Sequence, residues 1–301
     1  MVLRVVPSVM YSTVQAAIDD SSSGDSLKIL AGTFDGFEVT VGKDNLKIFG
    51  CGIGRTIIAG ASAQGSNDGV VVNANRTILQ GFTVQGFSNI GIFVPSNNNV
   101  MKQIESTLNS DEGILIIGEN NLISNCKTSF NNSGIEINDE NNCVISCVST
   151  QNDFFGYSFQ DVQCKLLFSL AKNNRSIGLD LDDDFNTIFQ NKFLGNGCGI
   201  KIDDENNNVI GNIVCNNIDS GILLDNNADF NVVDSNIVKN NGNDVSGGSG
   251  IFVDSSTENN PVRFNKLRNN TPFDIEIEGL VTDNIYNGNK CENSNFPGIC
   301  T

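Results

Sequence analysis

The chain repeats one pattern of hydrophobic and polar positions about every 22 residues. A glycine begins each copy, and the first and third residues after it are apolar, whereas the second varies from Glu136 to Lys201. Alternation over so few residues predicts a short β-strand with one buried face. The glycines that begin the copies are Gly69, Gly91, Gly113, Gly134, Gly156, Gly178, Gly199, Gly221 and Gly250.

Each copy continues with a second apolar position and two positions for small or amide side chains. The apolar position follows ten residues after the glycine, as at Ile188, and an asparagine follows after eighteen residues in six copies, as at Asn196. The pattern predicts two or three short strands per repeat, joined by turns rich in Asn, Asp and Gly. A repeat of this length buries too little surface to fold alone, so the repeats are expected to stack as the coils of a solenoid.

Stacking predicts columns of identical side chains inside the coils. An asparagine amide can donate to one neighbour and accept from the other, so the recurring asparagines are expected to form a ladder. Cys126 and Cys147 occupy the same position in adjacent repeats and are expected to be stacked interior thiols, with a disulfide or a redox pair as alternatives. Most of the nine cysteines are expected to be buried thiols, because no C-x-x-C spacing and no histidine suggest a zinc site.

The two ends of the chain depart from the repeat, as the ends of a solenoid should. Ser12 and Gln15 fit a capping box, and a short helix is expected to follow and cover the first coil. Cys291 and Cys300 bracket a loop near the other end, and the sequence leaves open whether they form a disulfide. No segment resembles a linker, so we expect a single domain over 1–301, with an N-terminal cap at 1–25, coils at 26–280 and a C-terminal cap or tail at 281–301.

The net charge of the chain argues against two classes of binding partner. The net charge is −17 and the pI is about 4.2, so neither nucleic acid nor an anionic membrane surface is an expected partner. A negatively charged polymer would need bridging cations. No apolar run approaches the roughly 18 residues of a spanning helix, and no signal peptide is evident. The sequence does not indicate an oligomeric state.

Two segments near the N-terminus resemble a known family. The first reads V-Q-A-A-I-D-D followed by S-S-S-G-D-S-L-K-I-L-A-G-T-F, and the second reads L-K-I-F-G-C-G-I-G-R-T-I-I-A-G. They resemble the opening of right-handed parallel β-helix proteins of the pectin-lyase-like superfamily, and the later repeats look like those of the nitrous-oxide-maturation type. The resemblance implies an all-β fold, a single-stranded right-handed parallel β-helix of about ten coils with a short N-terminal capping helix.

The same resemblance implies a range of functions. Members include pectate and pectin lyases, polygalacturonases, alginate epimerases and phage tailspikes, and many others have no known activity. In the enzymes, the substrate lies in a groove along the first strand of each coil, where acidic residues bind calcium or transfer protons. An extracellular or cell- or spore-surface location is also implied by the family alone.

The first-strand face of the later repeats holds the candidate site. Its outward positions include Asp180, Asp182, Lys201, Asp203 and Asp225. By resemblance to β-helix lyases, Asp180, Asp182, Asp203 and Asp225 would bind Ca²⁺ through oxygen ligands. Lys201, Asp180 and Asp203 are the candidate catalytic residues, with Lys201 as the base that removes a proton beside a substrate carboxylate. Such a role requires a lowered pKa for Lys201.

Two other interpretations remain open. Asp180 and Asp203 could act as a pair of carboxylates in glycoside hydrolysis, although the histidine motif of polygalacturonases is absent from this chain. Alternatively, the acids only close turns and keep the surface soluble, and the protein is a non-catalytic scaffold of a cell or spore envelope or a tailspike-like assembly. We therefore expect a carbohydrate-binding or polysaccharide-processing protein, and the sequence leaves open whether it is an enzyme.

Overall fold

The computed structural model describes residues 1–60, 68–243 and 248–301. They form two compact units, Met1–Val148 (unit 1) and Ser149–Thr301 (unit 2). The expectation of a single domain over the whole chain stays a prediction.

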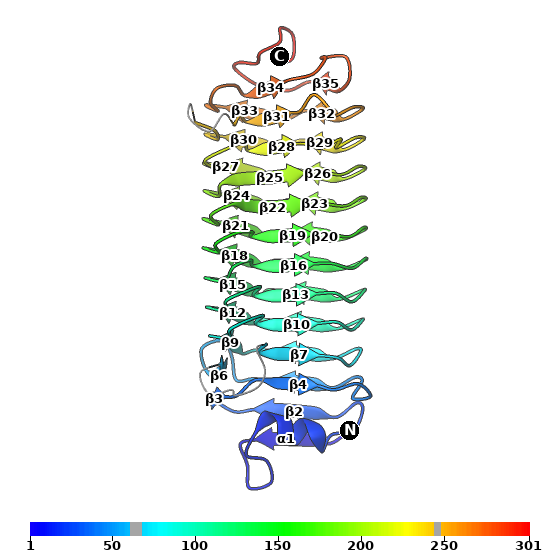
Figure 1. Cartoon of the computed structure of the whole chain (residues 1–301), viewed down its shortest axis with the longest axis vertical. Coiled ribbons are helices and arrows are strands. Elements are labelled where there is room, and N and C mark those ends of the chain that lie inside the picture. The colour runs from blue at the N-terminus through cyan, green and yellow to red at the C-terminus, as the bar shows by residue number, and fades with distance from the viewer. Residues whose placement is uncertain (61–67, 244–247) are drawn as a thin grey trace. The chain divides into compact units, whose positions relative to one another are not determined.

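Each unit is built from three parallel sheets, A, B and C, and each turn of the chain adds one strand to each sheet (Figure 1). Sheet A of unit 1 runs β1 (Leu3–Val6), β2 (Ser26–Ile29), β5 (Lys47–Phe49), β8 (Ile78–Gln80), β11 (Val100–Lys102), β14 (Leu122–Ser124) and β17 (Cys143–Ile145). Its sheet B runs β3 (Gly32–Phe34), β6 (Thr56–Ala59), β9 (Thr83–Gln85), β12 (Glu105–Thr107) and β15 (Lys127–Ser129), and β18 (Val148–Thr150) contains the boundary between the units. Its sheet C runs β4 (Phe37–Val39), β7 (Val70–Val72), β10 (Ile92–Val94), β13 (Ile114–Ile116) and β16 (Ile135–Ile137).

Unit 2 repeats this arrangement with longer central strands in sheet C. Its sheet A runs β20 (Lys165–Leu167), β23 (Thr187–Phe189), β26 (Asn208–Ile210), β29 (Val232–Asp234), β32 (Pro261–Arg263) and β35 (Ile285–Asn287). Its sheet B runs β21 (Leu170–Lys172), β24 (Lys192–Leu194), β27 (Ile213–Cys215), β30 (Ile237–Lys239) and β33 (Lys266–Arg268). Its sheet C runs β19 (Tyr157–Phe159), β22 (Ile177–Leu181), β25 (Cys198–Ile202), β28 (Ile222–Leu224), β31 (Ile251–Val253) and β34 (Ile275–Ile277).

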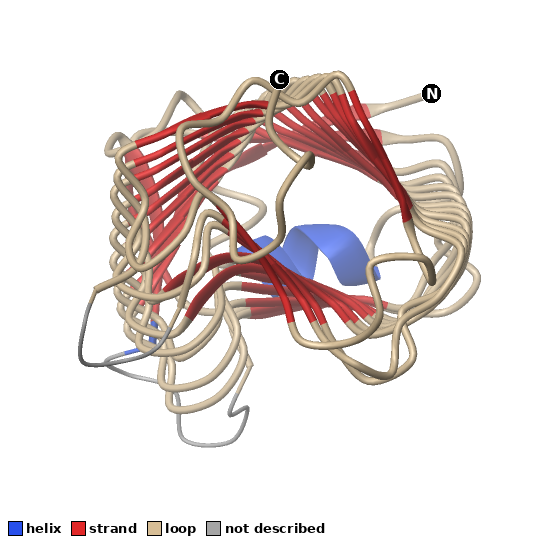
Figure 2. Ribbon diagram, turned by 90° about the horizontal axis from the view of Figure 1, so that it is seen from above, coloured by secondary structure: helices blue, strands red, loops and turns tan. Residues whose placement is uncertain are grey.

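The predicted right-handed parallel β-helix is confirmed in both units, where three sheets surround one interior (Figure 2). The segments that follow the repeating glycines are the strands of sheet C, and their alternation of buried and outward positions is as expected. Leu179 and Leu181 of β22 and Ile200 and Ile202 of β25 are fully buried. The prediction of about ten coils was slightly too low: within the described residues the sheets have 13, 11 and 11 strands, because the segments before Gly69 also form complete turns.

Buried asparagine ladders line the corners of the coils. In unit 2 the backbone and side-chain amides of Asn174 donate to Oδ1 of Asn196 at 3.0 Å, and Asn196 donates in the same way to Asn217. The ladder continues through Asn241 to Asn270, whose side chain donates to Oδ1 of Asp274 at 2.7 Å. The predicted ladder is therefore confirmed, and it satisfies corner amides that no strand partner could reach.

The ladder also explains why a glycine lies at or just before the start of several sheet C strands, of which β22 is an example. A Cβ atom on Gly178 would lie 2.5 Å from the carbonyl oxygen of Gly199 and 2.8 Å from the side-chain nitrogen of Asn196. Only a residue without a side chain allows the strand to approach the ladder this closely.

The N-terminal helix α1 (Val14–Asp19) packs against β1, β2 and β4 of unit 1, as the sequence predicted in outline (Figure 2). The capping box at Ser12 was wrong: Thr13 is the N-cap, and its hydroxyl accepts a hydrogen bond from the Ala16 amide at 3.1 Å. The Gln15 side chain instead donates to the carbonyl oxygen of Glu38 in β4 and accepts from the Glu38 amide. Its oxygen and nitrogen are therefore bonded to the first coil and do not cap the helix.

The cysteines follow the expectation only in part, because four of the nine are buried thiols, three are half-buried and two form a disulfide that the sequence left open. Cys291 and Cys300 form a disulfide. Cys126 and Cys147 are buried thiols, and the Cys126 amide donates to the Cys147 sulfur at 3.4 Å. The stacked thiols in this part of unit 1 are thus confirmed, and no disulfide joins them.

Candidate functional site

Three adjacent strands of sheet C in unit 2, β22, β25 and β28, position the candidate residues. Asp180 pairs in register with Lys201, and Lys201 pairs with Leu223 of β28. Because Leu179, Leu181, Ile200 and Ile202 point inward, alternation places the Asp180 and Lys201 side chains on the outer face.

The next outward position of each coil also holds an acid. Asp182, Asp203 and Asp225 each donate a backbone hydrogen bond of 2.9 Å to the coil before, so their main chains continue the register of sheet C beyond the strands. Neighbouring coils lie one strand spacing apart, about 4.8 Å, which brings successive carboxylates within reach of one another.

Three of these carboxylates form one cluster, which we call the acidic cluster: Asp180, Asp182 and Asp203. One oxygen from each lies within 4.8 Å of the others. Lys201 borders the cluster, because its Nζ donates to Oδ2 of Asp203 and lies 3.8 Å from Oδ2 of Asp225. The Asn226 side chain donates to the other oxygen of Asp203 at 3.3 Å.

Asp180 is the unusual member of the cluster. Its exposed fraction is 6%, and its buried Oδ1 has no hydrogen-bond partner. Burial raises the pKa of Asp180 to about 7, and repulsion by Asp182 and Asp203 adds to the shift, whereas Lys201 opposes it. A buried carboxylate without a partner is costly, because the charge has lost its water and gained nothing in return.

The neighbouring groups respond to the same crowding. Burial raises the pKa of Asp182 to about 6, reinforced by its hydrogen bond to Asp203 and by the charge of Asp203. Partial burial lowers the pKa of Lys201, but the hydrogen bond and charge of Asp203, with Asp180 and Asp225, outweigh this effect and leave the pKa raised. Lys201 is therefore a firmly charged ammonium in the free site.

The structure brings together most of the residues that the sequence suggested. Asp180, Asp182 and Asp203 converge, and the catalytic candidates Lys201, Asp180 and Asp203 are immediate neighbours. Asp225, the fourth suggested metal ligand, is not a member of this cluster and instead lies beside Lys201. The lowered pKa that a catalytic base requires is not found for Lys201 in the free site.

Sequence reasoning missed a second group of acids, in unit 1. Burial raises the pKa of Glu112 to about 7, and the charges of Asp111 and Glu136 add to this shift. Asp111 and Glu112 directly precede the glycine of β13, and Glu136 lies at the centre of β16. The repeat assigns Glu136 to the outer face, but it does not indicate that an acid before a glycine lies close to it.

Membrane insertion finds no support in the helices. Among residues 1–60, 68–243 and 248–301, no helix has the length and apolar character needed to cross a bilayer.

Comparisons with known proteins agree with this architecture. Residues 68–213 match the family model described as "Right handed beta helix region". No protein with a curated description matches the chain in sequence.

Several solved structures resemble the chain in fold. The A-module of the mannuronan C-5 epimerase AlgE6 from Azotobacter vinelandii superposes with a TM-score of 0.80 at 18% identity, over 95% of this chain and 91% of that module. The Dettilon tailspike protein superposes with a TM-score of 0.75 at 14% identity, over 96% of this chain and 66% of the tailspike. Pectate lyase Pel9A superposes with a TM-score of 0.59 at 17% identity, over 98% of this chain and 78% of the lyase.

Identities this low establish the fold and nothing about the reaction. The family match and the three-sheet coils of both units lead to the same assignment. The chain has the fold of a right-handed parallel β-helix protein, which the family match places at residues 68–213 and the coils extend through both units.

Proposed function

We propose that this protein binds and processes a uronic-acid polysaccharide on the outer face of sheet C in unit 2, with a divalent cation, Ca²⁺, held by the acidic cluster. The structural neighbours named above include a mannuronan epimerase and a pectate lyase, which act on uronic-acid polymers according to their descriptions. A chain of net charge −17 would repel such a polyanion unless a cation intervened.

The observation that supports this proposal most directly is the unpartnered oxygen of Asp180. It is buried, it lies in a cluster with Asp182 and Asp203, and its pKa of about 7 shows that the free site disfavours the charged form. A bound cation would relieve this repulsion and supply the missing partner. A purely solubilising surface acid would instead be hydrated, with an unshifted pKa.

The donor set fits calcium. Carboxylate oxygens are the ligands that Ca²⁺ prefers, at about 2.3–2.6 Å, so two oxygens around one ion are at most about 5 Å apart. The cluster oxygens lie within 4.8 Å of one another. When bound, the cation would neutralise the cluster and a substrate carboxylate, which lowers the barrier to forming negative charge beside that carboxylate.

Lys201 is the residue that we assign to proton transfer. In the free site Asp203, Asp180 and Asp225 hold its ammonium in the charged form. With the cluster neutralised this attraction would weaken, so that the lysine could release its proton to water and then accept one from the sugar carbon beside the carboxylate. Asp203 positions Nζ through the hydrogen bond it accepts. The electron pair left on that carbon then either expels the glycosidic oxygen, which takes a proton from water, as in a lyase, or takes up a proton from water on the other face, as in an epimerase.

Hydrogen exchange in deuterated water tests both outcomes at once. Pectate and alginate would be incubated with the protein and Ca²⁺, and deuterium at the carbon beside each carboxylate would be followed by NMR, with absorbance of unsaturated ends as a second readout. We expect exchange with at least one polymer that stops on chelation and falls at least about 100-fold in Lys201→Met, since proton transfer contributes on the order of 10²–10⁴. Asp153→Asn, which removes an exposed carboxylate of unit 2 outside the cluster, should leave the rate unchanged.

The absence of exchange with every polymer would refute processing. Binding on an array of acidic glycans would then separate the two remaining functions. Cation-dependent binding that Asp180→Asn abolishes would indicate a carbohydrate-binding protein. The absence of any glycan binding would favour the non-catalytic scaffold, which the likeness to the Dettilon tailspike also fits.

A further inference from the structure

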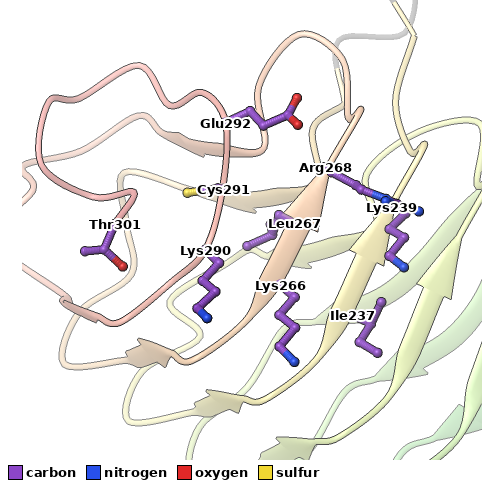
Figure 3. A pocket seen from close by; sticks show the side chains of 9 residues that line it. All are labelled: Ile237, Lys239, Lys266, Leu267, Arg268, Lys290, Cys291, Glu292 and Thr301. Carbon is purple, nitrogen blue, oxygen red and sulfur yellow. The ribbon is translucent and has the colours of Figure 1, made fainter.

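A second site candidate lies on a different sheet of unit 2, near the end of sheet B. A cavity of about 400 Å³ opens beside β30 and β33, and four cationic side chains line it, from Lys239, Lys266, Arg268 and Lys290 (Figure 3). We call it the basic pocket. Ile237 supplies an apolar side chain to its wall, and Glu292 is the only acid among the described residues that line it.

The register of sheet B brings the cations together. Lys239 pairs with Arg268 across β30 and β33, and Lys266 forms a bridge with Lys290 in the following turn. Leu267, between Lys266 and Arg268, is buried with an exposed fraction of 4%, so both cations point outward. Four positive charges thus occupy three successive turns, which are spaced about 4.8 Å apart.

Such stacking is unfavourable without a counter-charge, because like charges opposite one another destabilise a sheet. Within the described residues, none of the four cations forms an ion pair. An ion pair between neighbouring turns does form elsewhere in this part of unit 2. On sheet A, Nε of Arg263 in β32 lies 2.7 Å from Oδ2 of Asp234 in β29. A chain with 35 acidic and 18 basic residues therefore leaves four of its cations together around a cavity.

We propose that the basic pocket is a saccharide-binding site, which holds an acidic sugar of a uronate chain through its carboxylate. The identity of the sugar rests on the proposed function, but the binding itself requires neither the acidic cluster nor catalysis. Arg268 supplies the planar pair of N–H donors that matches a carboxylate, and the three lysines supply charge for the neighbouring acidic units.

The shape of the site favours a sugar over an inorganic anion. Its volume lies in the range of small-molecule pockets, roughly 300–1,000 Å³, which is far larger than a phosphate requires. Ile237 can pack against the C–H face of a sugar ring, while the cations face its carboxylate. The pocket lies on sheet B and the acidic cluster lies on sheet C, so the two sites occupy different faces of unit 2.

Titration with short oligogalacturonates and oligomannuronates in the presence of a chelator tests the pocket by itself. We expect calorimetry to show binding that weakens as salt concentration rises, and that is at least about tenfold weaker in the double variant Lys266→Gln/Arg268→Gln, since the variant loses two charge-assisted contacts to the carboxylate. Glu292→Gln should strengthen binding, because it removes the only acid of the lining.

Lys192→Gln is the matched control. Lys192 is exposed on β24 of the same sheet, and it occupies the outward position that Ile213 and Ile237 share in later turns. The Lys192→Gln variant should bind the oligosaccharides as tightly as the wild type does. Thermal melting of each variant separates lost binding from lost folding.

The contrary outcomes are clear. Equal affinity of the double variant and Lys192→Gln would overturn the proposal, and so would inorganic phosphate displacing the saccharide at equal concentration. Binding of a neutral oligosaccharide as tightly as a uronate would also refute it. Asp180→Asn should leave this binding intact, so the basic pocket can be confirmed even where the exchange experiment on the acidic cluster fails.

Discussion

Asp25 in unit 1 and Asp180 in unit 2 are both almost fully buried, with exposed fractions of 4% and 6%, yet they differ in every other respect. Asp25 accepts hydrogen bonds from the Val2 amide at 2.6 Å, from the Ser22 amide at 3.1 Å and from the Arg4 guanidinium at 2.6 Å. These bonds lower its pKa to about 2. Asp180 has an oxygen with no partner, and its pKa is about 7.

The difference shows that burial alone does not set the state of a carboxylate. Asp25 lies in a loop, where free backbone amides and one arginine can turn toward it. Asp180 lies in the middle of β22, where parallel strands on both sides already use the backbone groups. A carboxylate in that position can be satisfied only by neighbouring side chains or by a ligand, and its neighbours are themselves acids. Asp25 therefore stabilises the fold, whereas Asp180 destabilises it until something binds.

The largest effect is expected for Asp25→Asn. The substitution leaves the buried Arg4 without its nearest carboxylate, and a buried charge without its partner is strongly destabilising. We expect a drop of many degrees in the melting temperature at neutral pH.

Asp20→Asn is the control for that experiment, because Asp20 also pairs with Arg4, but its side chain is 59% exposed. It should lower the melting temperature only slightly. Equal losses for the two variants would mean that Asp25 is not the structural partner of the arginine.

The opposite sign is expected for Asp180→Asn. The folded pKa of about 7 exceeds the unfolded value of about 3.9, so the wild type loses stability as the pH rises from about 4 to about 7, and the loss is complete above that range. Without cations, the variant should therefore be more stable by about 2–3 kcal/mol at alkaline pH and by almost nothing below pH about 4. Urea unfolding across this pH range measures the difference.

Asp153→Asn, which removes an exposed carboxylate, should show no such pH dependence. A variant at Asp180 that is less stable than the wild type at alkaline pH would contradict our account of the cluster.

A smaller effect is expected for added calcium. Binding to the acidic cluster should stabilise the folded protein by about 1.4 kcal/mol at a free concentration ten times the Kd. The gain should disappear with a chelator and in Asp180→Asn, and it should persist in Asp153→Asn. Equal stabilisation of both variants by Ca²⁺ would place the ion elsewhere.

The smallest effect in this comparison is the change that Lys201→Met is expected to make in the pKa of Asp180. Lys201 opposes the upward shift of the Asp180 pKa, so its loss should raise that pKa further. NMR titration of the Asp180 carboxyl carbon gives the value directly. A fall in the pKa would show that the lysine does not face this carboxylate.

The repeat allowed much of the fold to be predicted from sequence, because each coil reuses the same physical solution. Alternation identified the sheet C strands, and the recurring asparagines predicted a ladder that Asn174 and Asn196 form as expected. The sequence placed the N-cap of the helix at Ser12, whereas the structure has it at Thr13. A capping box needs the Gln15 side chain at the helix start, and that side chain instead bonds to β4, which the local sequence does not indicate. The turns before Gly69 were undercounted, because the step from Gly36, which precedes β4, to Gly69 is longer than the repeat and hid the match.

The candidate site divides in the same way. The sequence by itself determined which side chains point outward, and therefore that Asp180, Lys201 and Asp203 share a face, because alternation and register follow from local pattern. Only the tertiary structure decided that one carboxylate oxygen of Asp180 is buried without a hydrogen-bond partner and that Lys201 is held in its charged form. It also decided that four cations far apart in the sequence surround one pocket. Burial, pKa and cavity shape depend on what packs across successive turns, and the pattern within one turn does not specify them.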